Sequence, residues 1–156
     1  MQITVLGGAR QVGRSAFLLK GRETNLLLDF GVLMQREPAF PMHVQPRDVD
    51  AILLTHAHLD HSGATPIFFL SDGVKLYTTD LTLELTQLLM EDFLRISGFY
   101  LPFEYIDLIY MMRRTKRVGL EDPFTIGEFT VTFHDAGHIP GSVSMVIEGG
   151  GKRMIY

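Results

Sequence analysis

The side chains with the most evident chemical potential lie in one heptapeptide, Thr55-His56-Ala57-His58-Leu59-Asp60-His61. Three imidazoles and one carboxylate within six positions are the ligand types that suit Zn²⁺ and similar first-row cations. His56 and His58 are two residues apart, so on an extended segment they point to the same side. Asp60 and His61 follow where the chain turns, so their side chains need not point toward the same metal as His56 and His58. Two ligand pairs that diverge from one loop predict two neighbouring metal ions.

Two side chains elsewhere in the sequence are placed to join this loop. His138 follows a predicted strand within Ala136-Gly137-His138-Ile139-Pro140-Gly141-Ser142, where glycine lets the backbone approach a site closely. We expect His138 to supply the third imidazole of the first metal. Asp29 ends an apolar strand, so its carboxylate has to be hydrogen-bonded or face a site. In contrast, His43 is predicted to be solvated in a proline-rich loop, and His134 is predicted to lie on a strand face.

The elements that must position these residues form an α/β pattern, with strands at both ends of the chain and helices in the middle. Apolar runs and alternation predict strands at 2–6, 15–19, 25–29, 48–54, 74–77, 124–126, 129–133, 143–147 and 152–156. The glycine-rich segment 7–14 has neither the spacing of a dinucleotide-binding motif nor the lysine of a P-loop. A loop with positive φ angles is therefore the favoured interpretation, and anion binding is the alternative.

Helices are predicted between these groups of strands. A short one begins with a cap at Ser62, reaches about Leu70, and is closed by Asp72-Gly73. A longer one begins with a cap at Thr79 or Asp80 and ends before Gly98. Its core-facing stripe is predicted to contain Leu81, Leu85, Leu88, Leu89, Phe93 and Ile96.

The densest basic cluster, Arg113-Arg114-Thr115-Lys116-Arg117, ends a further helical stretch that opens at Pro102. Cations near a helix C-terminus are favourable because the last carbonyl groups carry partial negative charge. A patch that faces a polyanion is the second interpretation of the same residues.

Composition limits the class of protein. A chain of 156 residues with 46% hydrophobic residues is expected to form one domain with a real core. It has no cysteine, which excludes disulfides and thiolate zinc sites and fits a cytoplasmic protein. It has no apolar run of membrane-spanning length and no signal sequence, so no membrane association is expected. The net charge of −4 argues against binding polyanions over the whole surface.

The order of motifs resembles the β-CASP branch of the metallo-β-lactamase superfamily over the whole range Met1–Tyr156. The matching motifs are the strand that ends in Asp29, the T-H-A-H-L-D-H heptapeptide, and A-G-H-I-P-G-S around His138. The opening G-G-A-R-Q-V-G-R-S is similar to archaeal homologues of the nuclease subunit of the cleavage and polyadenylation specificity factor. The branch also includes RNase J.

The resemblance implies an αββα fold and a two-zinc ribonuclease. It places His56, His58 and His138 on one Zn²⁺ and Asp60 and His61 on the other, while Asp29 supports the site without binding a metal. Asp60 is also expected to orient the hydroxide that attacks RNA.

Members of the branch continue after the last strand into an aspartate that bridges both metals, the β-CASP insertion and the second half of the sandwich. We therefore expect residues 1–156 to be the N-terminal part of such a domain, with a mixed sheet and helices on one face. Alone, this part is expected to be a poor catalyst. It is also expected to form a homodimer, because strands such as Phe129–Phe133 and Val143–Ile147 would keep an unpaired edge or an uncovered apolar face.

Two alternatives stay open. The same ligands would serve a hydrolase of thioesters, lactones or cyclic nucleotides on the same scaffold. A non-catalytic subunit of an RNA-processing complex is the second.

Overall fold

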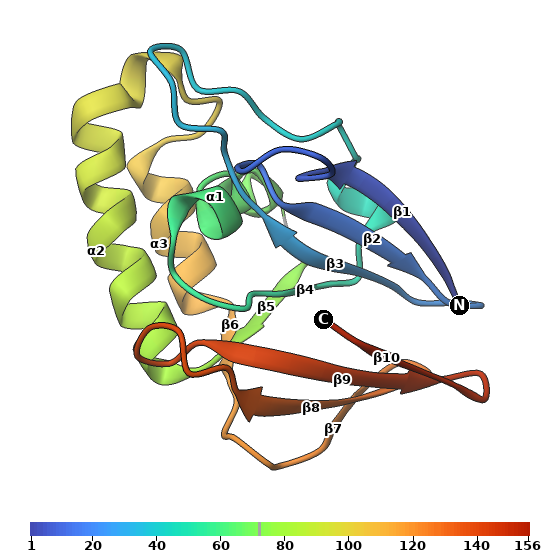
Figure 1. Cartoon of the computed structure of the whole chain (residues 1–156). Coiled ribbons are helices and arrows are strands. Elements are labelled where there is room, and N and C mark those ends of the chain that lie inside the picture. The colour runs from blue at the N-terminus through green and yellow to red at the C-terminus, as the bar shows by residue number, and fades with distance from the viewer. Residues whose placement is uncertain (72) are drawn as a thin grey trace.

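The structure is a computed structural model that describes residues 1–71 and 73–156, and it contains two stacked β-sheets and a group of helices (Figure 1). The larger sheet has the order β1-β2-β3-β4-β5-β6 and the smaller one β10-β9-β8-β7. The strands are β1 (Gln2–Gly7), β2 (Ala16–Lys20), β3 (Asn25–Phe30), β4 (Ala51–Leu53), β5 (Lys75–Thr78), β6 (Thr115–Arg117), β7 (Phe124–Ile126), β8 (Phe129–Asp135), β9 (Val143–Gly149) and β10 (Lys152–Ile155). The helices are α1 (Leu59–Ser62), α2 (Asp80–Ser97) and α3 (Tyr105–Arg113), with 3₁₀ turns at Pro46–Asp48, Thr65–Phe69 and Gly98–Tyr100.

The larger sheet is mixed. β1, β2 and β3 pair antiparallel, whereas β3, β4, β5 and β6 run parallel. A parallel strand is covered on both faces, which explains why every residue of β4 and Leu26–Phe30 of β3 are buried. The predicted α/β class and the predicted hairpin of the second and third strands are confirmed.

The two faces of the larger sheet build two separate cores. Leu27 and Ile52 face the helices, where they pack with residues such as Phe68. Leu28 and Leu53 face the smaller sheet. The smaller sheet contributes alternate residues of β8 and β9 to this second core: Phe129, Val131, Phe133, Val143, Met145 and Ile147. Helices, larger sheet and smaller sheet therefore form three successive layers.

The prediction that β8 and β9 keep an open edge or an uncovered apolar face is wrong. Both are inner strands of the smaller sheet, with β7 and β10 at its edges. Their apolar side chains are buried because the smaller sheet turns that face toward the larger one. The outward side chains, such as Thr132 and Ser144, are mostly polar.

The prediction of the buried stripe on α2 is largely wrong. Leu81, Leu88 and Ile96 are 52%, 58% and 83% exposed. The buried residues of α2 are Thr82, Leu83, Thr86, Met90 and Phe93, so of the predicted stripe only Phe93 is fully buried. Both stripes have helical spacing, and the tertiary contacts of the first turn select one of them. The predicted cap is confirmed, because the side chain of Thr79 accepts a hydrogen bond from the Thr82 N–H.

The predicted helix that starts at Ser62 is also wrong. Ser62 is instead the last residue of α1, and a separate 3₁₀ turn, Thr65–Phe69, follows. The Ser62 hydroxyl is within hydrogen-bonding distance of the carbonyls of Ala57 (2.9 Å) and His58 (3.1 Å), so it braces the turn that carries the histidines. Of the predicted helix end, Asp72 lies outside the described residues. No helix in the described part of the chain is long and apolar enough to cross a membrane.

Candidate metal centre

The candidate site lies where the parallel strands of the larger sheet end. Asp29 is near the carboxyl end of β3, and the heptapeptide begins two residues after β4. The smaller sheet reaches the same point, because the Val143 N–H at the start of β9 donates to the Thr55 carbonyl at 2.9 Å. Residues far apart in the sequence therefore meet at one edge of the two sheets.

Three imidazoles meet there. One ring nitrogen each from His56, His58 and His138 can be chosen so that all three atoms lie within 4.8 Å of one another. His58 Nδ1 and His138 Nε2 are 3.4 Å apart. Two nitrogens on a tetrahedral Zn²⁺ with bonds of about 2.0–2.1 Å are about 3.3 Å apart, so the arrangement fits a zinc ion. His56 is buried, His58 half-buried and His138 exposed, so the cluster opens toward solvent.

Hydrogen bonds set the tautomer of His56. Thr55 Oγ1 lies 2.8 Å from Asp29 Oδ2 and 2.9 Å from His56 Nδ1. A carboxylate only accepts, so the single hydroxyl proton goes to Asp29 and His56 Nδ1–H donates to Thr55. The lone pair of His56 then lies on Nε2, available to a metal. Burial first, and then the neighbouring His61, lower the pKa of His56 to about 4, which keeps the ring neutral.

Asp29 lies beside the candidate ligands and accepts hydrogen bonds from them and from their neighbours. It is fully buried, and its backbone has φ +54°, which is rare for a residue with a side chain. Oδ1 accepts from the Thr55 N–H at 2.8 Å, and Oδ2 accepts from His61 Nδ1 at 2.7 Å and the Tyr156 hydroxyl at 3.0 Å. Burial and then the charge of Asp29 raise the pKa of Tyr156, so its phenol stays a donor. These contacts occupy the Asp29 oxygens and connect Asp29 to the candidate ligand His61 and, through Thr55, to His56.

Asp60 and His61 form a second pair of potential ligands. His61 Nδ1–H donates to Asp29, so its Nε2 is free, and Nε2 lies 3.7 Å from Asp60 Oδ2. The ring centroids of His61 and His56 are 4.2 Å apart, so the pair adjoins the three-imidazole cluster. Burial lowers the pKa of His61, but the Asp29 hydrogen bond and the nearby carboxylates outweigh it, and the net shift is upward.

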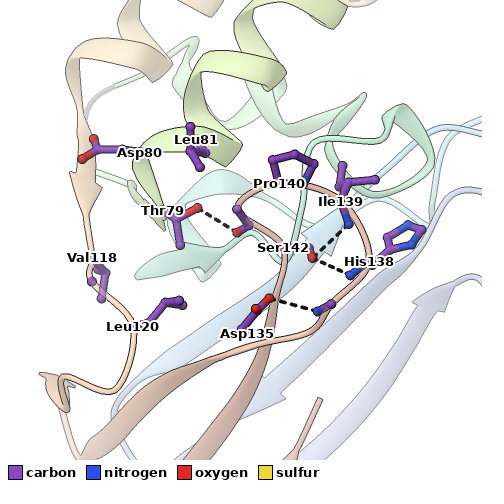
Figure 2. A pocket seen from close by; sticks show the side chains of 13 residues that line it. Thr79, Asp80, Leu81, Val118, Leu120, Asp135, His138, Ile139, Pro140 and Ser142 are labelled. Atoms are coloured by element: carbon purple, nitrogen blue, oxygen red, sulfur yellow. Dashed lines mark hydrogen bonds between the residues drawn. The ribbon is translucent and has the colours of Figure 1, made fainter.

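The loop that carries His138 is fastened to the start of α2. The Ser142 hydroxyl oxygen accepts from the His138 N–H at 3.2 Å. The Thr79 and Thr82 hydroxyls both donate to the Gly141 carbonyl at 2.8 Å. Figure 2 shows the bond from Thr79 together with the bonds to Ser142. These bonds tie the loop that carries His138 to the first turn of α2.

Two cavities adjoin the candidate ligands. The first, here called the His138 cavity, has a volume of about 600 Å³ (Figure 2). Its lining residues are Thr79, Asp80, Leu81, Val118, Gly119, Leu120, Asp135, Gly137, His138, Ile139, Pro140, Gly141 and Ser142. The second, of about 440 Å³, is lined by Val12, Gly13, Leu33, Met34, His58, Leu59, Asp60 and Leu89. At least one candidate ligand residue lines each cavity: His138 lines the first, and His58 and Asp60 line the second.

Several residues that were considered in the sequence analysis lie outside the three-imidazole cluster. His43 is exposed, as predicted. His134 lies on β8, as predicted, where its Nδ1 is 2.9 Å from a carboxylate oxygen of Glu121. The basic cluster is divided between the two ends of β6: Arg114 donates to the Ser71 carbonyl before β5, whereas Arg117 pairs with Asp80 at the start of α2. Only Arg117 is therefore at the end of the sheet where the histidines lie.

Three residues of the site were not predicted from the sequence. Thr55 links Asp29 to His56, and Tyr156 contacts Asp29 across 127 positions of sequence. At Gly31, a Cβ atom would lie 1.8 Å from the Asp60 carbonyl oxygen, so only glycine fits there. The glycine after a strand was visible in the sequence, but nothing indicated which segment it contacts.

The chain belongs to the metallo-β-lactamase superfamily: the family model described as "Metallo-beta-lactamase superfamily" matches residues 9–156. RNase aCSPSF2 of Saccharolobus solfataricus is 36% identical over 143 residues, which cover 90% of this chain and 29% of that protein. Ribonuclease TTHA0252 of Thermus thermophilus is 34% identical over 163 residues, covering 100% of this chain and 37% of that protein. The predicted relationship to processing nucleases of this superfamily is confirmed.

The fold agrees with this assignment. A solved metallo-β-lactamase from Cronobacter sakazakii, in a variant of its HARLDQ motif, matches with a TM-score of 0.67 at 19% identity. The match covers 99% of this chain and 60% of that structure. By the coverages given above, the chain spans about a third of the length of the two ribonucleases, which are considerably longer proteins.

Proposed function

We propose that this chain carries the metal centre of a zinc-dependent ribonuclease that holds two Zn²⁺ ions. The observation that carries the proposal is the convergence of three imidazoles, with His58 Nδ1 and His138 Nε2 at tetrahedral ligand spacing. The ribonucleases that the chain resembles support RNA as the substrate.

His56, His58 and His138 would hold the first ion, and Asp60 and His61 the second. When bound, the ions would supply charge stabilisation for a phosphodiester and lower the pKa of water. The chain's own residues prepare this chemistry. Thr55 and Asp29 accept hydrogen bonds from the Nδ1 atoms of His56 and His61, which would leave the Nε2 atoms available to the metals. Asp60, beside His61, would accept a hydrogen bond from the attacking water and orient it.

The extent and assembly of the enzyme are part of the proposal. Residues 1–156 would form the N-terminal part of a longer metallo-β-lactamase domain, and the second ion would take further ligands from outside this range. Alone, this part would cleave RNA poorly. A homodimer is supported by the exposed stripe of Leu81, Leu88 and Ile96 on α2. The absence of cysteine favours the cytoplasm.

The test replaces His58 with alanine in the full-length enzyme, with His43→Ala as the matched control because His43 is exposed outside the cluster. We expect H58A to lose RNA cleavage and zinc, measured by elemental analysis, while its circular dichroism spectrum stays that of the wild type. H43A should keep both properties. An H58A protein that cleaves RNA at the wild-type rate, or a wild type without zinc, would contradict the proposal.

A further inference from the structure

The His138 cavity has the composition of a nucleobase site rather than a phosphate site. No Lys or Arg is among the described residues that line it, and the carboxylate of Asp135 repels an anion there. Its apolar wall includes Leu81, Val118 and Leu120. Its volume of about 600 Å³ lies within the range of about 300–1,000 Å³ that is typical of small-molecule sites.

The polar groups of this cavity are mostly occupied. The Thr79 hydroxyl donates to Gly141, and the Ser142 hydroxyl oxygen accepts from backbone N–H groups. The charge of Asp80 is balanced by Arg117 at 3.1 Å. Ligand recognition by these three side chains would require breaking contacts that the fold already uses.

Asp135 is the exception. Its Oδ1 accepts from the Gly137 N–H at 2.9 Å, and its Oδ2 has no hydrogen bond or ion pair among the described residues. Asp135 is exposed, and Figure 2 draws it between Leu120 and His138. A carboxylate oxygen can only accept, so this position suits a ligand group that donates.

We propose that the His138 cavity binds the base of the nucleotide next to the scissile phosphate, and that Asp135 Oδ2 selects bases with an exocyclic amine. The proposal rests on the proposed ribonuclease function, because His138, a candidate metal ligand, forms part of the cavity wall. Because His138 belongs both to the cluster and to the cavity wall, a nucleotide held at the metal centre would lie beside the loop that borders this cavity. Cytosine presents an N4 amine where uracil presents the O4 acceptor, so cytosine is favoured over uracil at this position.

The variant Asp135→Asn separates recognition from structure. Its Oδ1 still accepts from the Gly137 N–H, while the second position becomes an amide NH₂ that donates. The preference should then turn from cytosine toward uracil. A hydrogen bond to a charged group accounts for roughly tenfold discrimination, so the wild-type ratio of kcat/KM for cytosine over uracil should be about 10 and fall to 1 or below in D135N.

The assay uses the full-length enzyme and RNA oligonucleotides that differ only in C or U beside the cleaved bond, on either side of it. Asp92→Asn is the matched control, since it removes the same charge from a 58% exposed side chain outside the cavity. Leu120→Trp is a second variant that fills the cavity and should raise KM at least several-fold for both oligonucleotides. A second readout is the relative affinity of the zinc-loaded enzyme for CMP and UMP, measured by competition between the two nucleotides.

The outcomes separate the two proposals. The base subsite is overturned if wild type and D135N cleave the C and U oligonucleotides with the same preference. It is also overturned if D92N changes the preference as much as D135N does. Either result leaves the ribonuclease proposal standing. Absence of RNA cleavage overturns the ribonuclease proposal. In that case the competition between CMP and UMP tests base binding in the cavity by itself. An affinity ratio of CMP to UMP that is unchanged in D135N overturns the subsite, and a reversed ratio supports it.

Discussion

Replacing Asp29 with alanine should weaken the metal centre and the fold together. The variant removes a fully buried carboxylate that accepts from the Thr55 N–H, the Thr55 hydroxyl, His61 Nδ1–H and the Tyr156 hydroxyl. Removing one partner of a buried charged network typically costs about 3–5 kcal/mol. Alanine at φ +54° adds about 1 kcal/mol of backbone strain. Since small domains are stable by about 5–15 kcal/mol, we expect a large fraction of the stability to disappear.

Metal binding should fall for a separate reason. Without Asp29 the His61 ring loses the partner that keeps its proton on Nδ1, and His56 loses the indirect support that passes through Thr55. Loss of such supporting hydrogen bonds typically lowers metal affinity by about 10–100-fold. D29N should be intermediate, because an amide keeps one accepting oxygen and asparagine tolerates positive φ.

Two measurements test this reasoning. Urea unfolding of the metal-free proteins gives the change in unfolding free energy, and chelator competition gives the zinc affinity. Asp50→Ala is the control: this exposed residue accepts one hydrogen bond from the Asn25 N–H, so its loss should cost less than about 1 kcal/mol. If D29A bound zinc as tightly as the wild type, or lost no more stability than D50A, the supporting role of Asp29 would be refuted.

Three further predictions concern other parts of the chain. Gly31→Ala should destabilise the protein by several kcal/mol in thermal unfolding and lower its zinc content, because the added Cβ would collide with the Asp60 carbonyl. A variant with an unchanged melting midpoint and unchanged zinc content would contradict the close contact between Gly31 and Asp60. Hydrogen bonds from the Thr24 side chain and from the backbone of Glu128, Glu23 and Arg22 lower the pKa of Glu128 from 4.5 to about 2. The stability that Glu128 contributes is therefore present above pH 4.5 and is lost as the pH falls toward 2. Urea unfolding at several pH values should therefore show the difference between wild type and E128Q shrinking over that window, and a difference independent of pH would argue against it. Replacing all four basic residues of 113–117 with alanine should weaken RNA binding and reduce its dependence on salt. If the cluster faces RNA, Arg117→Ala alone should produce most of the loss of binding. An unchanged salt dependence in the fourfold variant would mean that the cluster serves only at the helix end.

The corrected predictions share a cause, which the helix α2 illustrates. Its sequence contains one stripe through Leu81, Leu88 and Ile96 and another through Leu83, Met90 and Phe93, and both have helical spacing. Periodicity cannot rank them. The buried face includes Thr82, whose hydroxyl donates to the carbonyl of Gly141, a partner 59 positions away, and no local pattern contains such a contact.

The sequence by itself contained the residues from which the site was predicted. His56, His58, Asp60 and His61 were predicted as ligands because ligand types and spacing within one short loop are local properties, and His138 was predicted from its glycine-rich setting after a strand. The hairpin of β2 and β3, the existence of a strand before the heptapeptide and the cap at Thr79 are local in the same sense.

Tertiary structure decided how these residues work together. The 3.4 Å approach of His58 to His138 spans 80 positions, and the Tyr156 contact with Asp29 spans 127. Burial of β8 and β9 depended on the stacking of one sheet on another, which no single strand encodes. The ligand tautomers and the free oxygen of Asp135 likewise depend on which donors and acceptors come within about 3 Å after folding, and that is a property of the packed chain alone.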